Sequence, residues 1–357
     1  MLLDNLNKTR DNINLQLKQR INNSEEYDKE KIFINKIIIT NFTYRNIKMN
    51  NKFFIDCKYK NVRFIDCDLS KSKFMECIFE NVSFENCNFY NGSENIVVFD
   101  NNIFSNCTFI KCNLKKAIFM NTSIFDNKYI LSDMRNIIIS MSYIESIYFK
   151  DCDCSSFKTI NTVIKKIEFE DNHITKFNED TFIDKMEINK LDEMSCENLF
   201  RVYKSLENKF EGNRLFNISR EYYYLAKCAE RKLLKGVNKI KSYVFWLLCG
   251  YGERPMYALI TSLEILLFFT LIYMFSGLYV DGQVIKYSSN FILNLPIDNL
   301  FKDFFYSLYF SIVTFTAVGY GDITPTGTSI VFSAVEMILG VTMVGIWTAT
   351  LARKITR

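Results

Sequence analysis

The chain has 357 residues, of which 24% are charged and 48% are hydrophobic. These values are ordinary for a folded protein, and the length leaves room for two or three domains. The formal net charge of +4 is too small to indicate a nucleic-acid-binding protein. The averages hide an asymmetry, because the first 240 residues are rich in Asn, Lys, Ile and Asp whereas the last hundred contain two long apolar runs.

Residues 1–31 are polar, with a weak helical pattern. No secretory signal precedes them, so we expect residues 1–250 to stay in the cytosol and the cysteines to be reduced thiols. The domain that follows has an edge at its start, and an uncovered edge invites pairing with other chains. We therefore predict that residues 1–31 form a helical cap over that edge.

A period of five residues runs through residues 32–178. Large apolar residues recur at every fifth position from Ile34 to Ile174, and the series is broken at Glu94, Cys154 and Thr159. A second series of residues, often small, lies two positions before each of these. Five matches neither the helical period of 3.6 nor the strand period of two, so the pattern predicts a solenoid with both series pointing inward.

These repeats resemble the pentapeptide-repeat family, which implies a right-handed quadrilateral β-helix with four units per coil. The 29 units then predict about seven coils, stacked roughly 4.8 Å apart. We expect the Phe-filled interior to leave no room for a ligand. Seven of the 11 cysteines fall in the small series and are predicted to be core residues rather than metal or redox groups. They are Cys57, Cys67, Cys77, Cys87, Cys107, Cys112 and Cys152.

Two features near the repeats fall outside the apolar pattern. Residues 92–95, Gly-Ser-Glu-Asn, interrupt it without shifting the register, which predicts that a polar corner or bulge replaces one unit. The single histidine, His173, lies near the end of the repeats and is expected on the surface or in a cap.

Residues 190–253 change to a helical period. Apolar residues from Leu199 to Phe210 and from Leu215 to Leu233 predict a helical hairpin, with Ser195 as the N-cap and a break at residues 211–213. Lysines and aromatic residues alternate in residues 237–253, which favours an interfacial helix at the cytosolic membrane face. A plain continuation of the hairpin is the alternative.

Two apolar segments predict a membrane pore domain over residues 254–357. Residues 256–280 include one charge, Glu264, and residues 329–352 include one, Glu336. At about 1.5 Å per residue, each segment exceeds the roughly 30 Å of a bilayer core. Basic residues flank the cytosolic ends of both spans, which predicts a multi-pass protein of the cell membrane with both termini in the cytosol. They are Arg231, Lys232, Lys235, Lys239, Lys241, Arg254, Arg353, Lys354 and Arg357.

Residues 301–316 between the spans are apolar but too short to cross, so they predict a re-entrant pore helix. Pro296 and Asp298 precede it, and Asp298 is a candidate N-cap. Non-helical backbone at membrane depth occurs where it lines a water-filled path or is buried in protein. The two glycines that flank Tyr320 allow successive carbonyls to face one side, and four such strands around an axis make rings of oxygens for an ion.

Residues 255–352 resemble the two-helix pore of potassium channels, whose signature is Thr-Val-Gly-Tyr-Gly. The matching residues are Val318, Gly319, Tyr320, Gly321 and Asp322. The resemblance implies a homotetramer that conducts K⁺, with ions at the carbonyls of Ala317, Val318, Gly319 and Tyr320.

The departure from the signature is Ala317, which stands where the family usually has Thr. The resemblance then implies an innermost ion site without its hydroxyl ring. We expect K⁺ selectivity to survive, with weaker ion or blocker occupancy at that site. Thr316 is expected to face the pore helix, and Thr316 and Asp322 are candidate filter supports.

Four residues in the spans invite further hypotheses. Gly340 lies in mid-span, where the resemblance implies a gating hinge and close packing is the alternative; Gly345 is a second hinge candidate. Glu336 is expected at the level of the filter, where it either bonds behind the pore helix or influences the passage of ions. Glu264 is expected two turns into the first span, and a hydrogen-bonded buried carboxyl is the alternative to a functional role for both glutamates.

The sequence therefore predicts a multidomain chain: a right-handed quadrilateral β-helix, an α-helical connector and an all-α two-helix ion-channel pore domain, assembled as a tetramer. We predict a K⁺-selective channel regulated through the repeat domain by an unknown partner, within the lipid bilayer. The chain shows no catalytic constellation, so we expect no enzyme activity, no cofactor beyond the permeant K⁺ and no nucleic acid. The alternatives are a non-selective cation channel and a membrane-tethered interaction scaffold.

Overall fold

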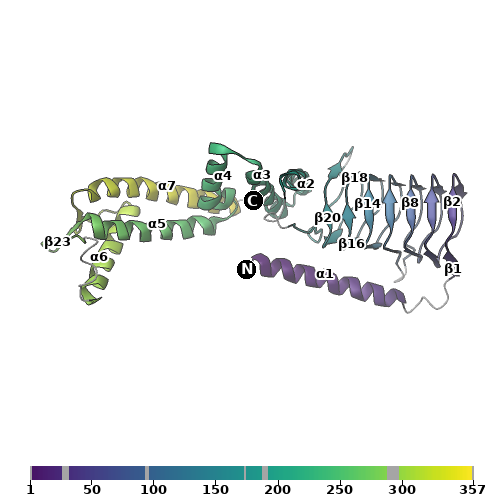
Figure 1. Ribbon diagram of the computed structural model, residues 1–357, viewed down its shortest axis with the longest axis horizontal. Coiled ribbons are helices and arrows are strands. Elements are labelled where there is room, and N and C mark those ends of the chain that lie inside the picture. The colour runs from purple at the N-terminus through teal and green to yellow at the C-terminus, as the bar shows by residue number, and fades with distance from the viewer. Residues whose placement is uncertain are drawn as a thin grey trace. The chain divides into compact units, whose positions relative to one another are not determined.

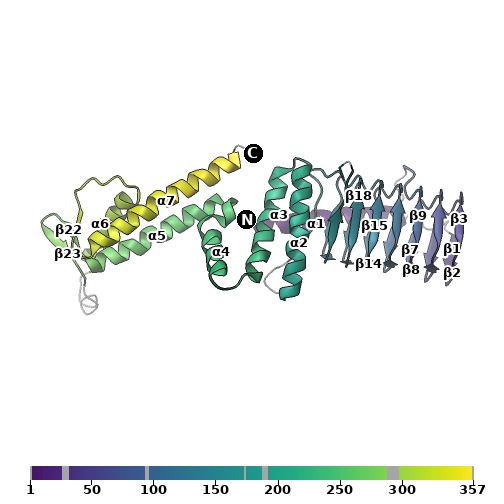
Figure 2. The same ribbon diagram turned by 90° about the horizontal axis from the view of Figure 1, so that it is seen from above.

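The computed structural model describes residues 2–25, 32–92, 96–172, 174–186, 192–287 and 297–355. It divides into two compact units, Met1–Leu233 and Leu234–Arg357, which we call the repeat unit and the pore unit. Figures 1 and 2 show the strands of the repeat unit as a stack of parallel coils and the pore unit as a small set of helices. Each unit is described by itself.

The repeat unit contains three parallel sheets in its described residues, each with seven strands, and every coil contributes one strand to each sheet. The first sheet comprises β1 Ile32–Asn35, β4 Lys52–Ile55, β7 Lys73–Met75, β10 Val98–Asp100, β13 Ile118–Met120, β16 Ile138–Ser140 and β19 Lys158–Ile160. The second comprises β2 Ile38–Thr40, β5 Lys58–Lys60, β8 Ile78–Glu80, β11 Ile103–Ser105, β14 Ser123–Phe125, β17 Tyr143–Ile144 and β20 Val163–Ile164. The third comprises β3 Thr43–Arg45, β6 Arg63–Ile65, β9 Ser83–Glu85, β12 Thr108–Ile110, β15 Asn127–Ile130, β18 Ile147–Lys150 and β21 Ile167–Phe169.

The fourth side of the coil is formed by a ladder of single bridges that runs from Lys48 through Asp68 and Asn88 to Lys176. The described coils therefore have four sides, and the predicted solenoid of about seven turns is confirmed. Residues at the corners, such as Asn41, Asn61 and Asn81, have φ values of 52–53°. Asn tolerates this left-handed backbone better than most residues, which explains the Asn-rich composition.

The strand register measures the length of each coil. Phe54 pairs with Phe74, 20 residues later, as four units of five require. Phe74, however, pairs with Phe99, which is 25 residues away. The prediction that one unit is replaced at residues 92–95 is therefore wrong, since one extra unit of five is inserted and the period survives. Residues 93–95, including Glu94, lie outside the described part of the chain, as does His173.

The interior of the solenoid is filled by stacked rings. The rings of Phe54 and Phe74 lie 4.7 Å apart between centroids, and those of Phe99 and Phe119 lie at the same distance, close to the spacing of neighbouring strands. The small series lies beside them, and all 11 cysteines are free and buried, as predicted. Cys107 donates to the carbonyl of Phe79 in the coil below. Burial raises the pKa of Cys107 to about 12, so its thiol stays protonated.

The last coil departs from the predicted register. Ile174 is 53% exposed, and Phe177 packs into the core in its place. The inward residues therefore follow the period of five only as far as Phe169. A helical hairpin of α2 Glu193–Gly212 and α3 Phe216–Leu233 covers this end, with Leu206 and Phe210 in the same core as Phe177. The predicted hairpin and its break are confirmed.

One polar contact caps α2 and another locates the hairpin on the last coil. The N-cap of α2 is Asp192, whose carboxylate accepts from the backbone N–H of Ser195, so the prediction of Ser195 as the cap is wrong. Lys209 of α2 forms an ion pair with Asp171, which also accepts from the hydroxyl and the N–H of Thr175. Burial alone would raise the pKa of Asp171, but the hydrogen bonds from Lys209 and Thr175 hold it below its ordinary value.

The N-terminal helix, α1 Leu2–Glu25, does not cap the first coil, so that prediction is wrong. Ile13 and Leu17 pack instead on the outer face of the first sheet, against Val98, Ile118 and Ile138. Both views show α1 lying along the side of the stack (Figures 1 and 2). Among the described residues, none covers the end of the first coil, where Ile37 of the small inward series is 41% exposed. A helix with an apolar stripe finds more apolar surface along the sheet than at the small end of a coil.

The pore unit begins with α4 Gly236–Cys249 and the short 3₁₀-helix Gly250–Gly252, followed by α5 Pro255–Ser276. Pore helix α6 covers Ile297–Phe315 and α7 covers Ser329–Ile355. Since α6 begins at Ile297, Asp298 lies in its first turn and is not an N-cap, while Pro296 lies outside the described residues. Among the described residues, α5 and α7 are long and apolar enough to cross a membrane.

The first span is shorter than predicted. It ends at Ser276, and the following residues form β22 Leu278–Val280, which pairs with β23 Gln283–Ile285 and with β24 Thr324–Pro325. Helix α4 belongs to the pore unit and packs on α5, where the hydroxyl of Thr261 donates to the carbonyl of Leu247. A plain continuation of the hairpin is therefore wrong, and the position of α4 at the membrane face stays a prediction.

Candidate functional site

Residues 317–321 follow the C-terminal end of α6 directly. The backbone φ is positive at alternate residues: 56° at Ala317, 60° at Gly319 and 81° at Gly321. Val318 and Tyr320 between them are exposed, at 53% and 72%. An alternation of left-handed and right-handed residues turns successive carbonyls toward the same side of the chain, which is the geometry that a row of oxygen ligands needs. Glycine adopts the left-handed conformation without strain, whereas Ala317 holds it at a modest energetic cost.

Both ends of this segment are anchored. At its start, the N–H groups of Ala317 and Val318 donate to the carbonyls of Thr314 and Val313 in the last turn of α6. At its end, Ile323 is buried in the core of the pore unit and β24 pairs with β22. The segment is thus held between the pore helix and a small sheet.

The two predicted supports lie on either side. The hydroxyl of Thr316 donates back to the carbonyl of Ile312, 2.7 Å away, so it faces the pore helix as predicted. Asp322 is exposed and lines the same surface pocket as Tyr309 of α6. The hydrogen bond of Thr316 therefore links the segment to the helix that precedes it, and a supporting role of Asp322 stays a prediction.

Glu336 lies fully buried where the three long helices of the pore unit meet. One carboxyl oxygen accepts from the hydroxyl of Ser311 on α6 at 2.5 Å, and the other accepts from the hydroxyl of Tyr273 on α5 at 2.6 Å. The structure therefore places Glu336 behind the pore helix. The tyrosine and serine partners carried no signal in the sequence, because they come from residues 63 and 25 positions away.

Gly340 lies one turn after Glu336 on α7. A Cβ atom at this position would lie 1.9 Å from the carbonyl oxygen of Phe315, the last residue of α6. This contact explains the glycine by close packing, and α7 runs unbroken through it. Bending at Gly340 stays a prediction. Gly345 has open space around it within the chain.

Glu264 differs from Glu336 in its surroundings. Its side chain is exposed on α5 within the described chain, so the expectation of a buried carboxyl is wrong for this residue. A carboxylate in a span is expensive in lipid, so such residues usually face protein or water. Glu264 therefore marks a side of α5 that the chain itself does not cover.

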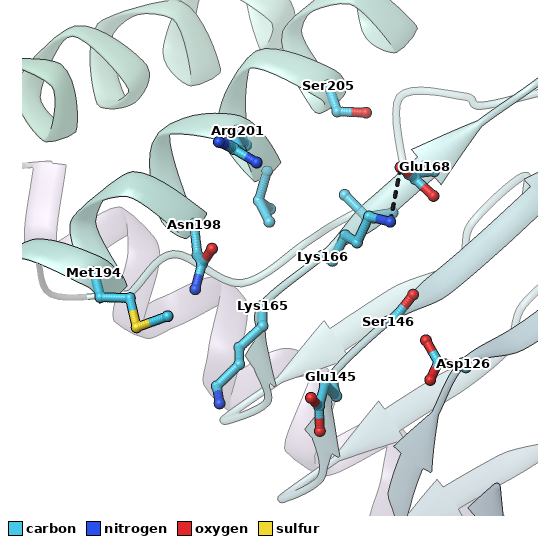
Figure 3. A pocket seen from close by; sticks show the side chains of 12 residues that line it. Asp126, Glu145, Ser146, Lys165, Lys166, Glu168, Met194, Asn198, Arg201 and Ser205 are labelled. Carbon is cyan, nitrogen blue, oxygen red and sulfur yellow. Dashed lines mark ion pairs between the residues drawn. The ribbon is translucent and has the colours of Figure 1, made fainter.

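The repeat unit has a groove of about 530 Å³ between its last coils and α2. The coils contribute Lys165 and Lys166 to its lining and α2 contributes Asn198 and Arg201; in Figure 3 Lys166 points toward Glu168 and Lys165 points away from α2. Lys166 pairs with Glu168 at 3.0 Å, and Arg201 pairs with Glu197 at 2.7 Å. This groove lies on the surface, and it leaves the expectation that the ring-filled interior has no room for a ligand unchanged.

Comparison with known families assigns both units. Residues 260–357 match the ion channel family model, and residues 60–91 match the family model described as pentapeptide repeats (8 copies). The chain therefore joins a pentapeptide-repeat domain to an ion channel domain with two membrane-spanning helices. It is a membrane protein, and both families are non-enzymatic kinds.

Comparison with solved structures finds proteins that match 40–46% of this chain. They include full-length QnrB1, a plasmid-mediated fluoroquinolone resistance protein (12% identity, 42% of this chain and 92% of that chain, TM-score 0.21). HetL from the cyanobacterium Nostoc, involved in heterocyst differentiation regulation, has 8% identity over 40% of this chain and 92% of its own, with a TM-score of 0.11. Rfr23 from the cyanobacterium Cyanothece has 10% identity over 46% of this chain and 99% of its own, with a TM-score of 0.15. Identities and TM-scores this low support no inference about function. The comparison with curated proteins found no match to the sequence.

Proposed function

We propose that this chain is one of four identical subunits of a K⁺-selective channel. The observation that carries the proposal is the alternation of backbone handedness at Ala317, Gly319 and Gly321 directly after a pore helix. Four copies of this segment around an axis would stack rings of carbonyl oxygens, and such rings replace the hydration shell of K⁺. The exposed apolar side chains of the segment fit an assembly in which neighbouring copies cover them.

The pore helix adds an electrostatic contribution. The C-terminal end of a helix carries a partial negative charge, because its last carbonyls have no partners in the helix. Helix α6 ends at Phe315, immediately before the segment, so four such ends would favour a cation at the inner side of the filter. This effect supports cation conduction in general, and the spacing of the carbonyl rings decides between K⁺ and Na⁺.

The test is a measurement of selectivity on the purified full chain in liposomes or planar bilayers. We expect the reversal potential under bi-ionic conditions to follow the K⁺ gradient, with Gly319→Ala abolishing the flux because a Cβ atom strains the left-handed backbone. A reversal potential that ignores the K⁺ gradient would overturn K⁺ selectivity. That outcome favours the second candidate, a non-selective cation channel, for which the missing hydroxyl at Ala317 is the specific observation.

Orientation and regulation follow from the same proposal. The basic residues that flank both spans favour cytosolic termini, and labelling of single cysteines placed near either end in sealed vesicles would test this. The repeat unit would then be a cytosolic body through which a partner acts on the pore. A version that begins at Leu234, the start of the pore unit, is expected to retain flux and to lose any regulation by cytosolic factors.

A further inference from the structure

We infer that Glu336 and Gly340 form a seat for the C-terminal end of the pore helix, and that Glu336 is a positioning residue for the filter. This inference rests on the proposed function, since it concerns how the same segment is held in its conducting geometry.

The seat consists of two contacts that are one helical turn apart on both helices. Ser311 and Phe315 are four residues apart on α6, and Glu336 and Gly340 are four residues apart on α7, so each pair lies on one face of its helix. The first contact is the 2.5 Å hydrogen bond from Ser311 to Glu336. The second is the backbone of Phe315 against Gly340, where no side chain fits between the two helices.

Helix α5, the first span, is tied to the same point. The hydroxyl of Tyr273 on α5 donates to the second oxygen of Glu336, and its ring packs edge-on against Phe310 at 4.8 Å between centroids. Ser311 also reaches the carbonyl of Leu266 on α5, 3.1 Å away. A buried carboxyl is costly unless hydrogen-bonded, and here both of its oxygens accept hydrogen bonds from hydroxyl groups of other helices. Loss of either hydroxyl leaves one oxygen without its donor.

The position of the seat links α7 to the filter. Phe315 is followed by Thr316 and then by Ala317, the first residue of the candidate filter. A closely packed contact transmits displacement, because protein interiors have little free volume to absorb it. A shift or rotation of α7 therefore moves the end of α6 and the carbonyls that follow. The backbone geometry of the filter segment therefore depends on the position of α7.

The experiment compares variants that each remove one part of the seat, using the full chain in bilayers. Ser311→Ala and Tyr273→Phe each remove one hydroxyl with little change in shape. We expect each to lower the K⁺ over Na⁺ permeability ratio or the open probability by about tenfold, the effect of losing one hydrogen bond to a charged group. Ser262→Ala is the matched control, because Ser262 bonds within its own helix to the carbonyl of Ala258 and should match the wild type.

Two substitutions at Glu336 separate positioning from simple packing. Glu336→Ala removes both acceptors and is expected to have the largest effect. Glu336→Gln retains one acceptor and gains a donor, and Ser311 can turn its hydroxyl to Leu266 while accepting from the amide. We therefore expect Gln to restore most of the wild-type ratio. A Gln variant as impaired as Ala, with normal tetramers, would contradict the role of hydrogen bonding.

Gly340→Ala tests the second contact. We expect a change in the permeability ratio, because the added Cβ atom pushes on Phe315 and hence on the filter. A change in gating with an unaltered ratio would indicate a hinge instead and overturn this half of the seat.

Failure of the seat is distinguishable from failure of the proposed function. If wild-type protein shows no K⁺-selective current, the proposed function fails before any variant is measured. If the wild type is selective and Ser311→Ala, Tyr273→Phe and Glu336→Ala all retain its ratio and open probability, the seat fails alone. If Glu336→Ala does not assemble, the two hydroxyl variants decide the question.

Discussion

The two units of this chain differ in how they remove their apolar residues from water. In the repeat unit, Phe104 and the other rings in the middle of the stack are buried within one chain, and each strand between the first and last coils pairs with the coil above and below. In the pore unit, Tyr320 and Ile338 are exposed at 72% and 68% although the segments that contain them are strongly apolar. The first unit buries its apolar core within one chain, whereas the second leaves apolar surface that we expect lipid and other copies of the chain to cover. Under the proposed function, stability is therefore an internal property of the repeat unit and conduction is a collective property of the pore unit.

The largest expected effect tests the closed core of the repeat unit. Phe104→Ala removes a buried ring from β11, and we expect a loss of about 3–5 kcal/mol of unfolding free energy because the stacked neighbours cannot collapse into the space. The adjacent Ile103 is 41% exposed on the same strand, so Ile103→Ala should change stability by less than about 1 kcal/mol. Thermal unfolding of the purified protein, followed by circular dichroism, measures both. Equal losses would contradict the inward and outward assignment.

A smaller effect is expected at the polar contact between the last coil and its cap. Asp171→Asn weakens the pair with Lys209, and we expect a loss of about 2–3 kcal/mol, as for hydrogen bonds to charged groups. Because the pKa of Asp171 is lowered on folding, its contribution is fully present above the unfolded value of about 3.9 and is lost as the pH falls through the lower folded value. Denaturant titrations between pH 6 and pH 2, values chosen to span this range, should show a shallower acid loss for Asp171→Asn than for the wild type. Parallel curves would refute the assignment.

Mixing subunits tests the collective nature of the pore unit. If four copies complete one filter, equal amounts of wild type and Gly319→Ala leave only about one sixteenth of the assemblies with four intact segments. Flux should then fall to about that fraction. Wild type mixed with the control Ile103→Ala should retain full flux. A fall to one half would mean that each chain conducts by itself.

The smallest effect concerns the innermost ion site. Ala317→Thr adds one hydroxyl per subunit at this site. We expect the apparent affinity for K⁺, measured from the concentration dependence of conductance, to rise by roughly threefold. The effect is modest because the gain from one weak oxygen ligand is partly offset by strain in the left-handed backbone. Ala317→Val adds similar bulk without the oxygen and is the control. An equal change in both variants would assign the effect to bulk or to the left-handed backbone rather than to the hydroxyl.

Most of the repeat unit could be predicted from local pattern. A period of five gives the number of coils and the inward residues, because each coil repeats the same local geometry and stacks on an identical neighbour. The errors lie where the repetition is interrupted or ends. The five residues inserted near Gly92 preserve the period, so the sequence shows no shift even though the register changes to 25. The exchange of Ile174 for Phe177 depends on the hairpin that packs there.

The candidate site also has one part that local sequence predicts and one part that it does not. The filter segment is readable because its glycines answer a local backbone requirement at adjacent positions. Glu336 stood out as a charge in an apolar span, yet the sequence did not predict that it would be buried and Glu264 exposed, because each is the single charge of its span. One carboxyl is buried beneath Ser311 and Tyr273 and the other is exposed. That difference depends on which face of each helix meets a neighbour.

The sequence by itself therefore determined the period of the solenoid, the two spans and the glycine pattern of the filter segment. These features depend on φ preferences and on apolar spacing within a few consecutive residues. The tertiary structure alone decided that α1 lies along the first sheet, that Gly340 supports the end of α6 and that Glu336 joins three helices. Such contacts unite residues tens of positions apart, and their energies depend on shape and hydrogen-bond geometry that no local pattern encodes.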